Sequence, residues 1–142
     1  MNLCILGPPD SGKSYLAKAL GIVACNDYRV EYHRCEVLLE QFVALKAVDY
    51  MKYQKRLKQI CGPALLILDN FLLHTLSEER EVKILFEILK QRCEINLSTI
   101  TCSQRDPSSW SAMNMNDEVS ANAILKRASW HYTVMIKPKA TS

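Results

Sequence analysis

Short apolar runs rich in β-branched residues alternate along this chain with longer segments in which apolar residues recur at helical spacing. The runs are NLCIL (2–6), YRVEYH (28–33), ALLILD (64–69), STITCS (98–103) and HYTVMI (131–136). This alternation is typical of a mostly parallel sheet covered by helices on both faces. ALLILD is apolar almost throughout, as a strand buried on both faces should be, so we expect it in the middle of the sheet. The pattern predicts an α/β fold.

The clearest helical pattern runs from Ser77 to Cys93. Ser77 suits an N-cap, and three glutamates follow it near the positive end of the helix dipole. One apolar stripe is formed by Val82, Leu85, Phe86, Leu89 and Cys93. Other helices are expected from Gly12–Ser14 through Leu16, Ala17, Leu20 and Val23, as a pair filling 36–58, and near 120–129, with a loop over 106–117.

The segment GPPDSGKS (7–14) follows the first apolar run and precedes a helical pattern. It satisfies G-x-x-x-x-G-K-[ST], the phosphate-binding loop, in the context that this motif requires. Gly12 lets the backbone approach a phosphate, Lys13 reaches the β- and γ-phosphates, and Ser14 binds Mg²⁺. The alternative is a glycine-rich turn that only caps a helix, and both flanks argue against it. The predicted nucleotide contacts are Gly7, Pro8, Pro9, Asp10, Ser11, Gly12, Lys13, Ser14 and Tyr15.

Asp10 is unusual in such a loop because a carboxylate that faces the phosphates repels them. At this variable position of the motif its side chain can point to solvent while only its backbone lines the phosphate site. We therefore expect weakened rather than abolished nucleotide binding.

A second nucleotide element is predicted at LLILDN, where an apolar strand ends in Asp69. Proteins with a phosphate loop place such a carboxylate beside the Mg²⁺ held by the loop serine. A turn-forming Asp-Asn pair is the alternative, and it would be preferred without the loop upstream.

The order and spacing of several motifs along the chain resemble those of one family. The motifs are LGPPDSGKSYLAKALG, LLILDNF, LFEILKQRCE, STITCSQRDPSSW and ANAILKRA. Together they resemble the IstB/DnaC-like branch of the AAA+ ATPases, which comprises helper ATPases of IS21-type insertion sequences and their helicase-loader relatives. The resemblance covers nearly the whole chain.

The resemblance implies a P-loop ATPase core with a five-stranded sheet in the order 5-1-4-3-2, which assembles with other subunits on double-stranded DNA. Residues 7–14 match the Walker A motif and Asp69 the Walker B aspartate. Asn70 stands where the family usually has a second acidic residue, and an amide can orient water but cannot take its proton. Gln104, after Ser103, matches the polar sensor, and the Ser-Gln pair favours the insertion-sequence members. Arg127 resembles the arginine that reaches a neighbouring subunit's nucleotide; a solvated helix-end cation is the alternative.

The family comparison also bears on domain organisation. Residues 1–142 are expected to form a single ATPase core without the family's N-terminal region and C-terminal tail, either truncated by gene decay or excerpted from a longer protein.

A basic segment between Lys46 and Lys58 contains five cations. On a helix, one face would carry Lys52, either Lys55 or Arg56, and Gln59. The opposite face would carry Ala47, Tyr50, Gln54 and Leu57. This face can neutralise DNA phosphates without reading sequence, and an ordinary solvated surface is the alternative.

Composition narrows the classes of protein to which the chain can belong. The chain has 142 residues, 49% of them hydrophobic, and a net charge of +3, which permits an anionic partner without requiring one. Six cysteines without a C-x-x-C pair, and three widely separated histidines, favour neither a zinc cluster nor a disulfide framework. No stretch approaches the ~20 apolar residues that cross a bilayer. We therefore expect a soluble cytoplasmic protein with reduced thiols.

These observations predict a protein that binds ATP and Mg²⁺ and acts as an oligomer on double-stranded DNA to recruit or regulate a transposase. A loader for a replicative helicase is the close alternative. A third hypothesis, favoured by Asn70, is a remnant or regulatory module that binds nucleotide or DNA without turnover. A small-molecule kinase would need a lid and an arginine-rich substrate insertion, and neither can be located.

Overall fold

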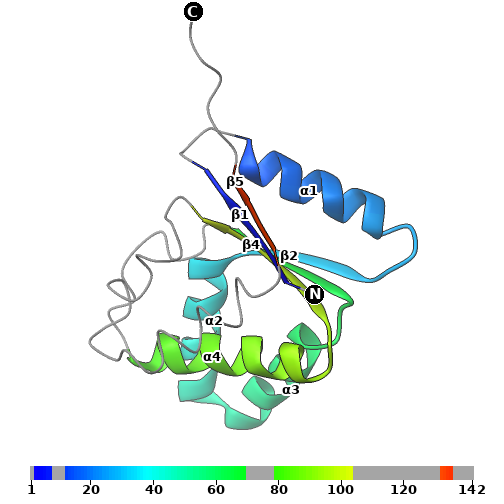
Figure 1. Ribbon diagram of the computed structural model, residues 1–142. Helices are drawn as coiled ribbons and strands as arrows, with labels where there is room; N and C mark the ends of the chain where they lie inside the picture. Colours follow the sequence, from blue (N-terminus) through cyan, green and yellow to red (C-terminus); the bar gives the residue numbers. More distant parts are fainter. Residues whose placement is uncertain (1, 8–11, 70–78, 104–131, 136–142) are drawn as a thin grey trace, which may run out of the picture.

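The computed structural model describes residues 2–7, 12–69, 79–103 and 132–135. Strands and helices alternate as the sequence predicts (Figure 1). The strands are β1 (Asn2–Leu6), β2 (Val30–Arg34), β3 (Leu65–Asp69), β4 (Ser98–Ser103) and β5 (Tyr132–Met135). The helices are α1 (Lys13–Ala24), α2 (Cys35–Val48), α3 (Tyr50–Ile60) and α4 (Glu79–Glu94). The helix expected near 120–129 and the loop expected at 106–117 lie outside the described residues.

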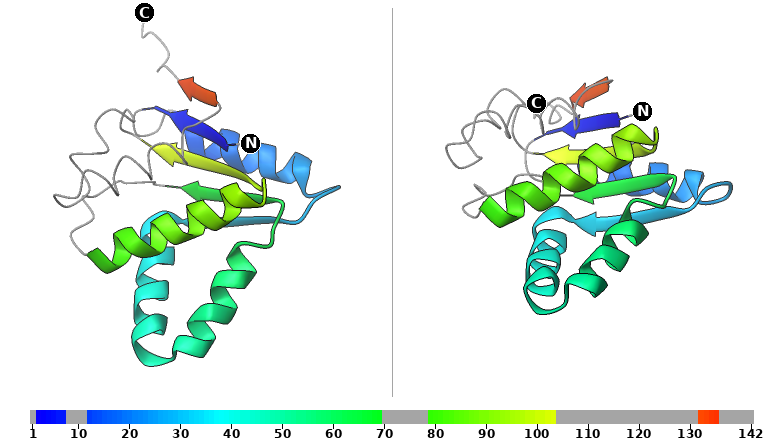
Figure 2. Two further views of the ribbon diagram at one scale, coloured as in Figure 1. Left: turned by 60° about the horizontal axis from the view of Figure 1, so that its bottom comes forward. Right: turned by 90° about the horizontal axis from the view of Figure 1, so that it is seen from below.

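The five strands form one sheet in the order β2-β3-β4-β1-β5, and every neighbouring pair is parallel. Figure 2 shows the strands side by side in this order in its right-hand view. Read from the β5 edge, the order is 5-1-4-3-2, which confirms the prediction. The strand ALLILD lies inside the sheet, between β2 and β4, with Leu66, Ile67 and Leu68 buried, although β4 rather than β3 is central.

The two faces of the sheet pack against different helices (Figure 1). Because side chains alternate along a strand, Leu65 and Ile67 of β3 face α1, whereas Leu66 and Leu68 face the opposite side. The α1 face holds a small buried cluster made by Ile5, Ala17, Ile67, Ile100 and Cys102. The other face packs against α2, α3 and α4 in a larger core that includes Phe42, Tyr53, Ile84 and Ile88.

The basic segment is not one continuous helix. Asp49 separates α2 from α3, and its carboxylate caps α3 by accepting a hydrogen bond from the Lys52 backbone N–H at 3.2 Å. The buried side of α3 consists of Tyr53, Leu57 and Ile60. Of the residues that the sequence places opposite the basic face, Leu57 is buried, whereas Ala47, Tyr50 and Gln54 are exposed.

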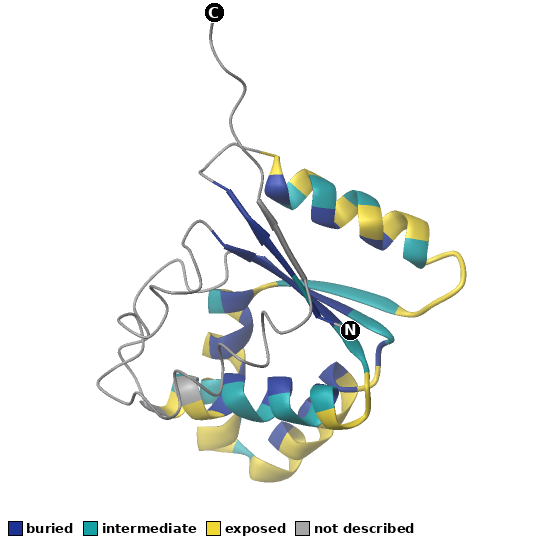
Figure 3. Ribbon diagram, in the orientation of Figure 1, coloured by how far each residue is buried: buried dark blue, intermediate teal, exposed yellow. Residues whose placement is uncertain are grey.

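Two other helical faces also differ from the prediction. In α1 the buried residues are Lys13, Ala17 and Gly21, whereas Leu20 and Val23 are exposed (Figure 3). A Cβ at Gly21 would lie 3.0 Å from Ile67 Cδ1, so the missing side chain brings α1 close to β3. In α4 the buried stripe includes Ile84 and Ile88, while Phe86 and Cys93 are only half-buried.

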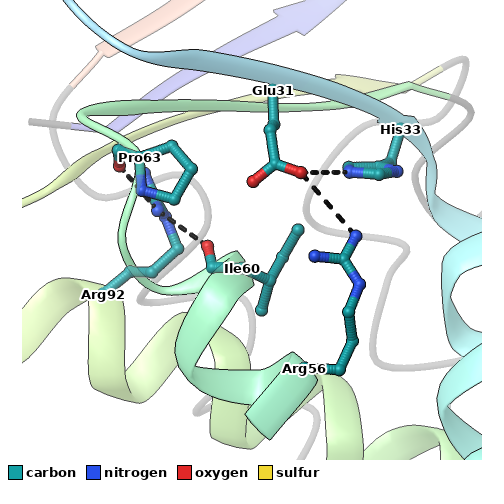
Figure 4. A network of polar contacts seen from close by, with 6 residues as sticks. All are labelled: Glu31, His33, Arg56, Ile60, Pro63 and Arg92. Atoms are coloured by element: carbon teal, nitrogen blue, oxygen red, sulfur yellow. Dashed lines mark hydrogen bonds and ion pairs between the residues drawn. The ribbon is translucent and has the colours of Figure 1, made fainter.

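Arg92 of α4 belongs to that stripe and is 1% exposed. Its guanidinium donates to the carbonyls of Ile60 (3.0 Å) and Pro63 (2.9 Å) (Figure 4). It also donates to Thr99 Oγ1 (3.0 Å) and to the Ser98 carbonyl (2.7 Å). Burial lowers the pKa of Arg92 to about 10, which leaves it charged at neutral pH. The side chain thus joins the end of α3 to the starts of β3 and β4.

No helix among the described residues is long and apolar enough to cross a bilayer.

Candidate nucleotide-binding site

The start of α1 stands at the carboxyl end of the sheet, where parallel α/β folds bind ligands. The Gly7 N–H donates to the Ser103 carbonyl at 3.2 Å, which fixes the exit of β1 against the end of β4. Gly12 precedes α1 with φ 90° and ψ 10°, in the left-handed region that favours glycine. A Cβ at Gly12 would meet no atom of the described residues within 4 Å, so these residues leave room beside the backbone for a phosphate to approach.

Strand alternation brings Asp69 to the start of α1. Asp69 has the same parity in β3 as Leu65 and Ile67, so its side chain is on the α1 face. There Ser14 Oγ donates to Asp69 Oδ1 at 3.0 Å, across 55 residues of sequence. The structure therefore unites the loop serine and the strand-end carboxylate, as the sequence predicts.

Tyr32 completes this group, and the sequence analysis gave it no role. Its hydroxyl donates to Asp69 Oδ2, and its ring lies under the Lys18 ammonium, 4.9 Å from nitrogen to ring centroid. Partial burial, together with the hydrogen bond to Asp69, raises the pKa of Tyr32 above its ordinary value, so the phenol keeps its proton. The only available sequence signal was its parity, because Val30 and Tyr32 share the face of β2 that packs toward α1.

The polar side chains at the base of the site are buried. Lys13 is 6% exposed and Asp69 is 4% exposed. Cys102 of β4 lies below the start of α1, with its thiol 4.0 Å from the Lys13 carbonyl. Burial, followed by the nearby Asp69 charge, raises the pKa of Cys102 to about 12, so this residue stays a neutral thiol. Among the described residues, the carboxylate at this point is therefore that of Asp69.

The donor set fits a magnesium ion that a nucleotide brings with it. Mg²⁺ usually binds one or two protein oxygens and completes its octahedron with water and substrate phosphates. Ser14 and Asp69 supply two such oxygens in direct contact. Among the described residues no cluster of three or more His, Cys, Asp or Glu side chains could form a separate metal cage. Bound there, the metal would neutralise phosphate charge.

A comparison with protein families points the same way as this geometry. The family model described as IstB-like ATP binding protein matches residues 1–141. The chain belongs to this family. A Pseudomonas aeruginosa protein named as an ATP-binding protein of the insertion sequence IS21 is 33% identical over 135 residues, or 94% of this chain and 49% of that protein. This IstB-like chain thus spans about half the length of the curated relatives it matches.

Solved structures show that the IstB-like chain has the AAA+ fold. AMPPCP-bound DnaA from Aquifex aeolicus superposes with a TM-score of 0.78 at 23% identity, over 94% of this chain and 39% of that one. The DnaC helicase loader superposes with a TM-score of 0.75 at 20% identity, over 97% of this chain and 78% of that one. At these identities the likeness concerns the fold.

The structure describes some of the predicted site residues of the IstB-like chain and not others. Gly7, Gly12, Lys13, Ser14 and Asp69 lie together at the carboxyl end of the sheet, and Tyr15, 81% exposed, points its ring to the surface. Pro8, Pro9, Asp10, Ser11, Asn70, Gln104 and Arg127 lie outside the described residues, so their roles stay predictions.

The predicted DNA-binding side chains do not form one uniform basic face. Lys52 and Lys55 are exposed on α3. Arg56, however, turns toward β2, where its NH2 nitrogen lies 3.7 Å from Glu31 Oε1, and His33 Nε2 lies 3.2 Å from the same oxygen (Figure 4). The Arg56 guanidinium is therefore paired with Glu31 within the fold, and the DNA-binding role of Lys52 and Lys55 stays a prediction.

Proposed function

We propose that this chain is the nucleotide-binding core of an ATP-dependent helper protein for an IS21-type insertion sequence. In this proposal it binds ATP with Mg²⁺, assembles on double-stranded DNA as an oligomer, and recruits or regulates a transposase. The supporting observation is the 3.0 Å contact between Ser14 and Asp69, which joins the two sequence motifs of a phosphate site. Membership in a family described by ATP binding supports the choice of nucleotide.

Each group at the site has a separate task in this proposal. The backbone at Gly12 and the first N–H groups of α1 hold phosphate oxygens, helped by the positive end of the helix dipole. The ammonium of Lys13 neutralises the terminal phosphates. Ser14 and Asp69 supply oxygens on the metal side of the triphosphate. An ion held by these two residues would neutralise negative charge on the phosphates.

Hydrolysis requires groups outside the described residues. Gln104 is proposed to sense the terminal phosphate, and Arg127 of one subunit to stabilise charge on the nucleotide of the next. Asn70 can orient water but cannot remove its proton, so turnover should be slow. ATP would then act mainly as a bridge between subunits, and slow hydrolysis would release the assembly.

Replacing Lys13 tests the nucleotide site directly. Lys13→Ala should lose detectable ATP binding in titration calorimetry with Mg²⁺. The triphosphate would then bind without the buried Lys13 ammonium that neutralises its charge. Lys58→Ala, which removes an exposed lysine of α3, is the matched control and should bind ATP as the unaltered chain does. Undiminished binding by Lys13→Ala would place the nucleotide elsewhere.

The DNA role has its own test on α3. Changing both Lys52 and Lys55 to Ala should weaken binding to duplexes of any sequence and lower the slope of log affinity against log salt by about 2. Arg56→Ala should change that slope less, since its guanidinium already contacts Glu31. Equal slopes for the unaltered and double-lysine chains would remove α3 from the DNA surface.

A second candidate is a nucleotide-binding module without turnover, which the neutral Asn70 favours. Asn70→Asp distinguishes the two, with phosphate release as the readout. A working ATPase impaired only at this position should gain turnover, whereas a module that has lost catalysis for other reasons should stay inactive. Failure to hydrolyse in both forms, together with retained ATP binding, would favour the module.

A further inference from the structure

Tyr32 reaches the nucleotide site from a strand that carries none of the sequence motifs. It lies in the middle of β2 and pairs in register with Ile67, two residues before the end of β3. Its ring packs with the apolar cluster on the α1 face, and its hydroxyl extends to Asp69. A side chain at an edge strand therefore touches the carboxylate that the phosphate loop uses.

The carboxylate of Asp69 is held at both of its oxygens. Ser14 Oγ donates to Oδ1 at 3.0 Å, and the Tyr32 phenol donates to Oδ2. A planar carboxylate fixed at one oxygen can still turn about its last torsion, which has a broad energy profile. A second donor on the other oxygen removes that freedom and directs Oδ1 toward Ser14.

The phenol is itself held in place by its surroundings. The Lys18 ammonium of α1 lies over one face of the ring at 4.9 Å, a cation–π arrangement. The apolar cluster of α1 and the sheet packs around the ring. Because Tyr32 is anchored by both α1 and β2, its hydroxyl is a fixed point from which the Asp69 carboxylate can be oriented.

We propose that Tyr32 is the positioning residue of the magnesium site, acting through Asp69. The inference rests on the nucleotide function proposed above and adds the residue that tunes its metal affinity. The phenol holds Oδ2, so that Oδ1 and Ser14 Oγ remain directed to one point before metal arrives. Tyr32 does not touch the nucleotide or the metal. Partners that orient a ligand in this way typically change metal affinity by roughly 10- to 100-fold when removed.

The decisive experiment removes one oxygen atom and measures metal and nucleotide separately. Tyr32→Phe in the full chain keeps the ring and its packing. Binding of a fluorescent ATP analogue is measured in EDTA, and Mg²⁺ is then titrated into the complex. We expect the Mg²⁺ midpoint to rise roughly 10- to 100-fold, while analogue affinity in EDTA stays within twofold of the unaltered chain. A change only in packing would weaken Mg²⁺ binding and analogue binding together.

Tyr28→Phe is the matched control, because Tyr28 precedes β2, is 62% exposed and loses the same single atom. A Tyr32→Phe midpoint equal to that of Tyr28→Phe would overturn the positioning role while leaving nucleotide binding intact. If the unaltered chain binds no analogue at all, the proposed function fails and this inference fails with it. The Mg²⁺ midpoint of the double variant Tyr32→Phe with Asp69→Asn should equal that of Asp69→Asn alone. Full additivity of the two changes in midpoint would also overturn the proposal.

Discussion

The two faces of the sheet differ in what their side chains do. On the α2–α4 side, a large apolar core is tied together by the buried Arg92. On the α1 side, a small cluster supports a polar group at its carboxyl end, where Ser14, Tyr32 and Asp69 meet. The same strands serve both faces, because successive residues point to opposite sides.

One face of the sheet thus contributes mainly to the stability of the fold, and the other carries the groups proposed to bind ligand. Tight packing around Arg92 fixes the ends of three elements, while the thin α1 layer leaves open space beside Gly12. A phosphate site needs that space, so it cannot also be densely packed. Variants on the α2–α4 face should therefore change the free energy of unfolding, whereas variants on the α1 face should change the affinity for metal and nucleotide.

The largest effect on stability is expected at Arg92. Arg92→Ala removes the donor to the carbonyls of Ile60, Pro63 and Ser98 and opens a cavity, at a cost of about 3–5 kcal/mol in the free energy of unfolding. Urea unfolding followed by circular dichroism measures this loss. Arg29→Ala, which removes an exposed arginine, should change the unfolding free energy by less than about 0.5 kcal/mol. A loss at Arg92 no larger than at Arg29 would contradict the structural role of the guanidinium.

Ser14→Ala should show the opposite behaviour. It removes the donor to Asp69 Oδ1 and one metal ligand, so the Mg²⁺ midpoint for the ATP complex should rise roughly 10-fold or more. Unfolding free energy should change by no more than about 1 kcal/mol, the ordinary net value of one hydrogen bond. Ser14→Thr keeps a hydroxyl and should retain most of the metal affinity. A large stability loss without a metal effect would break the division between the two faces.

The sequence predicted most of the fold because its signals were local. Strand runs, helical stripes and the phosphate-loop motif each lie within one segment, and the family resemblance supplied the strand order, which the sheet confirms. Ser14 and Asp69 were both identified from their motifs, and their contact was expected from the family arrangement. These predictions needed no knowledge of side-chain packing.

The errors lie where tertiary contacts decide. Tyr32 and Arg92 look like ordinary strand and helix residues, and only their distant partners give them a role. In the sequence Arg56 resembles part of a free basic face, but Glu31, 25 positions earlier, lies beside it in the fold. In α1, Gly21 rather than Leu20 meets the sheet, because close approach to Ile67 favours the smaller residue.

The smallest effect distinguishes two neighbouring threonines of β4 that point to the α4 side. Thr99 Oγ1 accepts from Arg92 at 3.0 Å, whereas the buried Thr101 Oγ1 has no hydrogen-bond partner in the part of the chain that the structure describes. Thr101→Val keeps the shape and removes an unsatisfied hydroxyl, so it should raise the unfolding free energy by about 1 kcal/mol. Thr99→Val should lower it by about 1–3 kcal/mol, because a buried charged donor loses its acceptor. Opposite signs in urea unfolding would show that hydrogen bonding to Arg92, and not β4 packing alone, stabilises this face; two losses of equal size would contradict that conclusion.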